Sequence, residues 1–160
     1  QTSVGLIFSE SPPNRTVGGG QVINARFEIP AGAENYEVKA ERTIKEDTYL
    51  THMTPHMHSR GKSFAYTAVY PDGTEEMLLN VPNYRFDWQL TYEFEQPKLL
   101  PAGTKLIGVA HYDNSVKNRD NPDATADVRW GDQTWEEMMI GFYGTVDAAN
   151  AIKATTNNNE

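Results

Sequence analysis

The hydrophobic positions of this chain alternate with polar ones over most of its length. Successive side chains of a strand point to opposite faces, so this alternation predicts strands that bury one face. No long apolar pattern with a helical period occurs. The predicted strands are Val4–Phe8, Gln21–Ile29, Tyr36–Ile44, Tyr49–His58, Ser63–Tyr70, Glu75–Val81, Trp88–Glu95, Lys105–Tyr112, Ala126–Trp130 and Met138–Val146.

Turn-forming residues separate the predicted strands. Proline and glycine recur at these points because proline fixes the backbone and glycine tolerates tight bends. Many short strands with frequent turns are typical of sandwiches and jelly rolls. We therefore expect an all-β fold, a jelly-roll-like β-sandwich that is mostly antiparallel. The clearest turns are Pro30-Ala31-Gly32, Pro71-Asp72-Gly73, Pro82-Asn83 and Pro101-Ala102-Gly103.

Two segments lack the alternating pattern and are predicted to be loops. Ser9–Gly20 contains prolines and consecutive glycines, and Asp113–Asp127 is rich in Asn and Asp. The second segment is expected to form a long loop at one end of the sandwich. We expect residues 1–147 to form a single domain and residues 148–160 to form a polar tail.

Composition narrows the classes of function. The 160 residues suffice for one domain with a core, and the net charge of -8 argues against nucleic acid as a partner. The chain has no cysteine, which excludes disulfides, zinc–thiolate sites, iron–sulfur clusters and blue copper. No apolar run approaches the roughly 20 residues of a membrane span.

A His-x-His motif within a predicted strand is the main chemical signal. His56 and His58 would point to the same face with Cα atoms about 7 Å apart, close enough to share one metal ion. A methionine from a distant strand would add a sulfur ligand, and sulfur favours copper, especially Cu(I). Met138 and Met139 are both available, and strand alternation alone does not choose between them. Two ordinary histidines on a partly exposed strand are the simpler alternative.

Two other histidines are weaker candidates. His52 has the same strand parity as His56 but lies about 13 Å away along a straight strand, unless the chain bends at Pro55. His52 is therefore expected to support the ligands or to take no part. His111 lies near the end of another predicted strand, where it either lines the site or stands at the surface.

Charged residues near the motif allow two interpretations. A ligating histidine usually donates its second N–H to an oxygen, and Glu136, Glu137 and Asp113 are candidates for this role. A solvated charge is the simpler expectation for each of them, and also for Arg60 and Lys62.

The long polar loop offers hard oxygen ligands of the kind that calcium prefers. Its spacing lacks the pattern of an EF-hand, and turns formed by Asn and Asp explain the composition more simply. The residues concerned are Asp113, Asn114, Asn118, Asp120 and Asp123.

Several segments, in the same order along the chain, resemble those of the copper type II, ascorbate-dependent monooxygenases. That family includes peptidylglycine α-hydroxylating monooxygenase and dopamine β-monooxygenase. The resemblance is closer to bacterial proteins with a domain of this type, including single-domain versions. The matching segments are Pro55–Lys62, Trp88-Gln89-x-x-Tyr92, Leu100–Thr104, Asp113-Asn114-Ser115 and Trp130–Met138.

The resemblance implies a jelly-roll-like sandwich that holds one copper ion, cycling between Cu(I) and Cu(II), through His56, His58 and Met138. It implies dioxygen activation and C–H hydroxylation of a small-molecule or peptide substrate, with electrons from an external reductant or redox module. We also expect an extracytoplasmic location, periplasmic or secreted. Copper binding or electron relay without hydroxylation, or a metal-free interaction domain, are the alternatives.

The chain departs from the family in ways that bear on the substrate. It matches only the C-terminal catalytic half, and the three-histidine copper of the N-terminal half is absent from the sequence. Thr54 stands where the peptide-hydroxylating members have an arginine that helps to hold the substrate carboxylate. Ile140 and Phe142 replace an asparagine and a tyrosine of those members. Glycine-extended peptides are therefore not the expected substrates.

Overall fold

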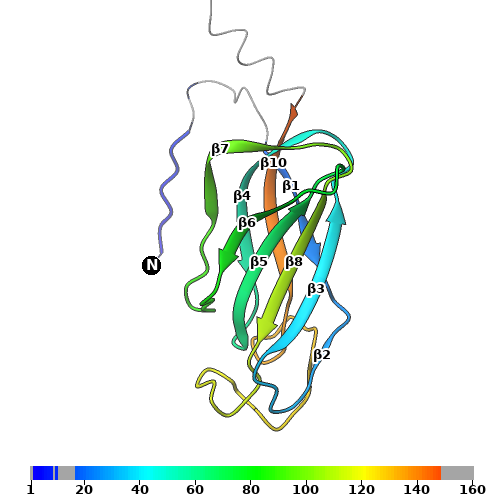
Figure 1. The fold of residues 1–160 in the computed structure, drawn as a ribbon. Coiled ribbons are helices and arrows are strands. Elements are labelled where there is room, and N and C mark those ends of the chain that lie inside the picture. Colours follow the sequence, from blue (N-terminus) through cyan, green and yellow to red (C-terminus); the bar gives the residue numbers. More distant parts are fainter. Residues whose placement is uncertain (1, 9, 11–16, 149–160) are drawn as a thin grey trace, which may run out of the picture.

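The computed structural model describes residues 2–8, 10 and 17–148, and the described chain forms an all-β sandwich (Figure 1). This confirms the fold class expected from the alternating pattern. No helix that could cross a bilayer is found among the described residues. The strands are β1 (Gly18–Ile23), β2 (Glu28–Ile29), β3 (Tyr36–Thr43), β4 (Thr48–His56), β5 (Gly61–Val69), β6 (Glu75–Val81), β7 (Tyr92–Leu100), β8 (Lys105–Tyr112), β9 (Val128–Arg129) and β10 (Ile140–Asp147).

Two four-stranded antiparallel sheets form the layers of the sandwich (Figure 1). One sheet has the order β1-β10-β4-β7 and the other the order β3-β8-β5-β6, while β2 and β9 pair separately. With β2 and β9 set aside, the first long strand pairs with the last, the second with the seventh, the third with the sixth and the fourth with the fifth. That nesting is a long hairpin rolled into two sheets, which is the jelly-roll arrangement.

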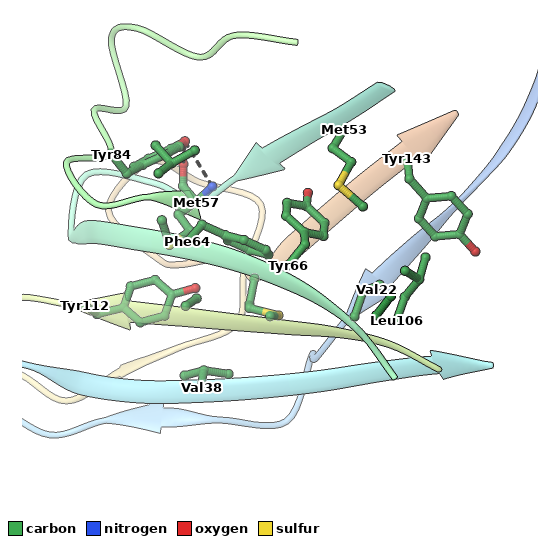
Figure 2. Close-up of a cluster of buried hydrophobic side chains, with 14 of the residues drawn as sticks. Val22, Val38, Met53, Met57, Phe64, Tyr66, Tyr84, Leu106, Tyr112 and Tyr143 are labelled. Atoms are coloured by element: carbon green, nitrogen blue, oxygen red, sulfur yellow. Dashed lines mark hydrogen bonds between the residues drawn. The ribbon is translucent and has the colours of Figure 1, made fainter. Parts of the chain in front are cut away.

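The core lies between the two sheets and consists mainly of aromatic and aliphatic side chains. Figure 2 shows Met53, Phe64 and Tyr66 in this layer, with Val22 and Tyr143 further along it. In β4, Met53 is fully buried toward the core and Thr54 is only partly buried, as the alternation of strand side chains requires. After the irregularity between Leu50 and His52, the outward-facing positions of β4 are therefore His52, Thr54 and His56.

Several predicted strand boundaries were wrong. Val4–Phe8 lies outside any strand, with Val4, Leu6, Ile7 and Phe8 exposed, because no described strand pairs with it. Gln21–Ile29 is divided into β1 and β2 by residues 24–27. The glycines at 18–20, assigned to a loop, begin β1, where the ring of Tyr143 occupies the space that a Cβ at Gly20 would need. Residues 9 and 11–16 of the predicted loop, and the predicted tail from residue 149, lie outside the described residues.

Three loops gather at the end of the sandwich that lies at the bottom of Figure 1. They are the turn between β4 and β5, the long polar segment that follows β8, and the segment that leads into β10. Residues 113–127 contain no strand, as predicted. The end of β4 brings the His-x-His motif into the midst of these loops.

Candidate metal site

His56 and His58 come together at the end of β4. His56 is the last residue of the strand and faces outward, while His58 lies two residues beyond it and is only 4% exposed. Their ring centroids are 5.2 Å apart and the rings stand at 82° to each other. Phe142 of β10 and Phe86 border the pair, with ring centroids 6.4 Å from His56 and 5.7 Å from His58 respectively.

Gln89 fixes the tautomer of His56. The amide nitrogen of Gln89 donates to the carbonyl of Phe86 at 3.0 Å, and a carbonyl can only accept. The amide oxygen therefore faces Nδ1 of His56, at 2.6 Å. Nδ1 must carry the proton in this bond, which leaves the lone pair of the neutral ring on Nε2.

The same argument applies to His58. Nδ1 of His58 lies 3.2 Å from the backbone carbonyl of Glu136, so Nδ1 donates and Nε2 carries the lone pair. Burial lowers the pKa of His58, and the charge of His56 acts in the same direction, against the backbone carbonyls of Glu136 and Gln133. The lowered pKa favours the neutral form, which is the form that binds metals. Both rings thus have the tautomer of an Nε2 ligand.

The structure separates the two methionines that the sequence left undecided. Met139 is fully buried in the core, with its methyl group beside Gly108. Met138 precedes β10 and is half-buried, as expected for the opposite parity. Ile140 and His56 form the last pair of the β4–β10 ladder, so Met138 and His58 each lie two residues beyond the same end of it. Met138, rather than Met139, is therefore the methionine whose sulfur is not committed to the core.

His52 and His111 lie elsewhere. His52 pairs with Gly144, four residues from the Ile140–His56 pair, and its ring covers Gly144. The ladder is regular at Pro55, which faces Gly141, so the chain does not bend there to bring His52 closer. His111 belongs to the other sheet, where Nδ1 lies 3.2 Å from Oγ of Ser63 and Nε2 lies 3.5 Å from a carboxylate oxygen of Glu37.

Glu137 is a buried carboxylate, contrary to the expectation of a solvated charge. It is 0% exposed and accepts hydrogen bonds from the backbone N–H groups of His58, Arg60 and Met138. Burial raises the pKa of Glu137 to about 7, while these hydrogen bonds and the charge of Arg60 act to lower it. The carboxylate of Glu136, in contrast, folds back to accept the backbone N–H of Gln133 at 3.0 Å. Two adjacent glutamates carry no pattern that reveals which one is buried.

Arg60 was also expected at the surface and is 1% exposed instead. Its guanidinium donates to the side chain of Asn114 at 2.8 Å, to the carbonyl of Trp135 at 2.9 Å and to the carbonyl of Asp123 at 3.4 Å. These bonds join the loops at the site end, because each acceptor lies on a different stretch of chain from Arg60. Lys62 is exposed, as expected.

The polar loop after β8 is organised by turns of Asn and Asp. Carboxylate or amide oxygens accept backbone N–H groups two residues ahead of them. Asp113 contributes to one such turn and not to the histidine pair. Oxygens engaged in this way account for the composition without calcium. The turns run from Asp113 to Ser115, Asn118 to Asp120, Asn121 to Asp123 and Asp123 to Thr125.

A cleft of 440 Å³ is lined by Ser59 and Phe86, the neighbours of His58, but not by either histidine of the pair. Phe86, which contacts the His58 ring, forms one wall, and Trp135, which is 61% exposed, forms another. Polar groups at its rim include the ion pair between Arg85 and Asp87 and the carboxylate of Asp120. The cleft is large enough for a small organic molecule.

The donor set defines the chemistry that the site can support. Within the described part of the chain, no cluster of three or more His, Cys, Asp or Glu side chains is placed to hold a metal. The histidine pair supplies two nitrogens, so a third protein ligand would be of another type, such as the thioether of the half-buried Met138. Two imidazoles and a thioether fit copper and do not fit magnesium or calcium.

Comparisons with known proteins add little to this description. No protein-family model matches the chain, and no curated protein matches it. A chain from a structure of infectious bursal disease virus, Gx strain, aligns over 91% of this chain at 10% sequence identity with a TM-score of 0.38. The alignment covers 35% of the viral chain, so this chain spans about a third of it. A likeness at this level supports no inference about function.

Proposed function

We propose that this protein is a mononuclear copper domain of the monooxygenase type, with His56, His58 and Met138 as the ligands. The single observation that carries the proposal is the fixed tautomer of both imidazoles, which leaves Nε2 of each ring as the metal-binding atom. Ligating histidines in proteins are commonly held in this way by a hydrogen bond to the second ring nitrogen.

The roles of the residues follow from their positions. Gln89 and the carbonyl of Glu136 orient the two rings, and Phe86 and Phe142 pack beside them. Met138 supplies the soft ligand that stabilises the reduced ion. Copper bound there would supply one-electron redox chemistry and the activation of dioxygen for C–H hydroxylation, with electrons from an external reductant.

The cleft lined by Phe86, whose ring contacts His58, is the proposed place for the substrate. Phe86 and Trp135 offer apolar contact area, while Ser59 and Thr134 offer polar contacts at the same opening. A small organic molecule bound there would lie against Phe86, on the far side of which is the His58 ring. Thr54 stands at the position of the carboxylate-binding arginine of the peptide-hydroxylating enzymes. Glycine-extended peptides are therefore not the proposed substrates.

The first test is Cu(I) titration of the wild-type protein and of His56→Ala, with a competing chelator to measure affinity. We expect a single site whose affinity falls by 10-fold or more in His56→Ala, on the order of the effect of disturbing a metal ligand. His52→Ala is the matched control, because it removes a histidine from the same strand four residues earlier. Equal affinity of the wild type and His56→Ala would remove the proposal.

Electron relay without hydroxylation is a second candidate function. Phe142 beside His56 is 41% exposed and Trp88 beside Gln89 is 69% exposed, and such aromatic side chains favour contact with a partner protein. The copper-loaded, reduced protein given oxygen and ascorbate would separate the two functions. Hydrogen peroxide or oxidised substrate would support the monooxygenase, whereas inertness toward oxygen with electron exchange to a redox module would support the relay.

A further inference from the structure

The side chain of Glu137 lies between the two segments that carry the proposed ligands. Its Oε2 accepts from the N–H of His58 at 2.8 Å and from the N–H of Met138 at 3.2 Å, and its Oε1 accepts from the N–H of Arg60 at 2.7 Å. His58 and Glu137 are 79 residues apart in sequence. One carboxylate thus ties the turn after β4 to the segment before β10.

This carboxylate takes the place of backbone pairing that ends just before the site. The β4–β10 ladder runs as far as the pair of His56 and Ile140, so His58 and Met138 lie beyond its last pair. Ladder hydrogen bonds position His56, but they do not position His58 relative to Met138. Glu137 spans that interval with two hydrogen bonds, from the N–H groups of His58 and Arg60, and accepts the N–H of Met138 within its own segment. The hydroxyl of Tyr112 donates to the carbonyl of Met138 at 2.7 Å.

Packing alone does not call for a carboxylate at this position. Met57, between the two histidines, and Met139, directly after Met138, are fully buried and apolar. A buried carboxylate is unfavourable unless donors satisfy it, and an apolar replacement would leave the amides of His58 and Arg60 without their acceptor. The arrangement therefore serves the geometry of the two segments.

We propose that Glu137 is a positioning residue that sets the separation between His58 and Met138 and thereby allows the Met138 sulfur to join both imidazoles on one copper ion. The inference rests on the proposed function. It concerns how the site is held together, and not which residues ligate. Glu137 itself is not a ligand in this arrangement, because its oxygens are engaged by backbone N–H groups.

The direct test is Glu137→Gln, whose amide has one accepting oxygen and one donating nitrogen. The donating end cannot accept an N–H, so at least one of the bonds is lost. Cu(I) affinity is expected to fall by about 10- to 100-fold. Copper X-ray absorption should show loss of the sulfur scatterer while the imidazole scatterers remain. Glu136→Gln is the matched control, since that carboxylate accepts an N–H outside the two segments, and it should leave both readouts unchanged.

A double-mutant cycle distinguishes positioning from a general structural role. If Glu137 acts through Met138, Glu137→Gln in a Met138→Leu background changes copper affinity by about twofold or less. The same fold loss with and without Met138 would overturn the proposal. Wild-type protein that binds no copper, or binds it without sulfur, would overturn the proposed function. Wild-type sulfur coordination that survives Glu137→Gln would overturn the positioning role alone.

If Glu137→Gln does not fold, amide exchange of the metal-free wild-type protein decides the matter. The amides of His58 and Arg60, which donate to Glu137 across the two segments, should exchange as slowly as ladder amides of β4, although both residues lie beyond the ladder. Fast exchange of either amide would show that the carboxylate does not hold the two segments together, and the proposal would fall.

Discussion

Gln89 and His56 are joined by a hydrogen bond of 2.6 Å between the amide oxygen and Nδ1, although 33 residues separate them in sequence. The second hydrogen bond of Gln89, to the carbonyl of Phe86, fixes the orientation of its amide. The loop between β6 and β7 therefore determines which nitrogen of His56 faces outward, and the sheet alone does not.

Replacing Gln89 should weaken copper binding without unfolding the protein. In Gln89→Ala the His56 ring loses the acceptor that holds its tautomer, and Cu(I) affinity should fall by about 10-fold or more. Gln89 is exposed, so the thermal midpoint should change little. Competition with a Cu(I) chelator measures the affinity. Thr91→Val is the control, because it breaks a bond to Thr54 on the same face without touching a histidine. Equal losses in both variants would contradict the role of Gln89.

Truncation of Met139 should mainly affect stability, whereas truncation of Met138 should mainly affect copper ligation. Met139→Ala empties a fully buried position and should reduce the free energy of unfolding by about 2–5 kcal/mol, with the copper ligands unchanged. Met138→Ala removes a half-buried side chain and should reduce it less, while the copper loses its sulfur ligand. Urea denaturation of the metal-free proteins and copper X-ray absorption give the two readouts. Sulfur lost in Met139→Ala and retained in Met138→Ala would reverse the assignment.

The sequence predicts the fold well because strand alternation is a local signal. Glu75–Val81 and Lys105–Tyr112 were predicted with the same bounds that β6 and β8 have. The start of β1 was missed because Gly18, Gly19 and Gly20 have no side chain to show which face is buried. Their pairing with β10 depends on a strand far along the chain.

The site was predictable only in part, for a similar reason. His56 and His58 share a face by local geometry, and the structure brings their rings together. The burial of Glu137 and Arg60 could not be predicted, because the partners of both are mainly backbone groups or loop residues 54–79 positions away. Such contacts exist only once the loops have assembled. Strand alternation could separate Met138 from Met139 only after the register with β4 was known.

Arg60 should be among the most sensitive charged residues of the protein. Arg60→Met keeps an apolar stem of similar length but removes the donors to Asn114 and Trp135 and the positive charge near Glu137. Loss of a buried charge with its partners left behind should reduce the free energy of unfolding by about 3–5 kcal/mol. Urea denaturation measures this loss. Lys62→Met, at an exposed position two residues later, should change it by about 0.5 kcal/mol or less. Similar effects of the two substitutions would contradict the buried network.

The stability of the metal-free protein should fall as the pH is lowered, with a contribution from His58. Burial lowers the pKa of His58 below its ordinary value of 6.5. Between that lowered pKa and 6.5 the unfolded chain binds more protons than the folded chain, so acid favours unfolding. The contribution of His58 is fully retained above pH 6.5 and is lost progressively below it.

His58→Asn isolates this contribution from that of the other titrating groups. The asparagine amide nitrogen takes the place of Nδ1 and can still donate to the carbonyl of Glu136, but it does not titrate. The urea midpoint of the wild type should therefore drop more steeply than that of His58→Asn as the pH falls below 6.5, toward the lowered pKa of His58. His111→Asn, on the opposite sheet, serves as the control for removal of a histidine. Parallel pH profiles of the wild type and His58→Asn would show that the imidazole of His58 is as easily protonated in the fold as in the unfolded chain, and the neutral Nε2 ligand would lose its physical basis.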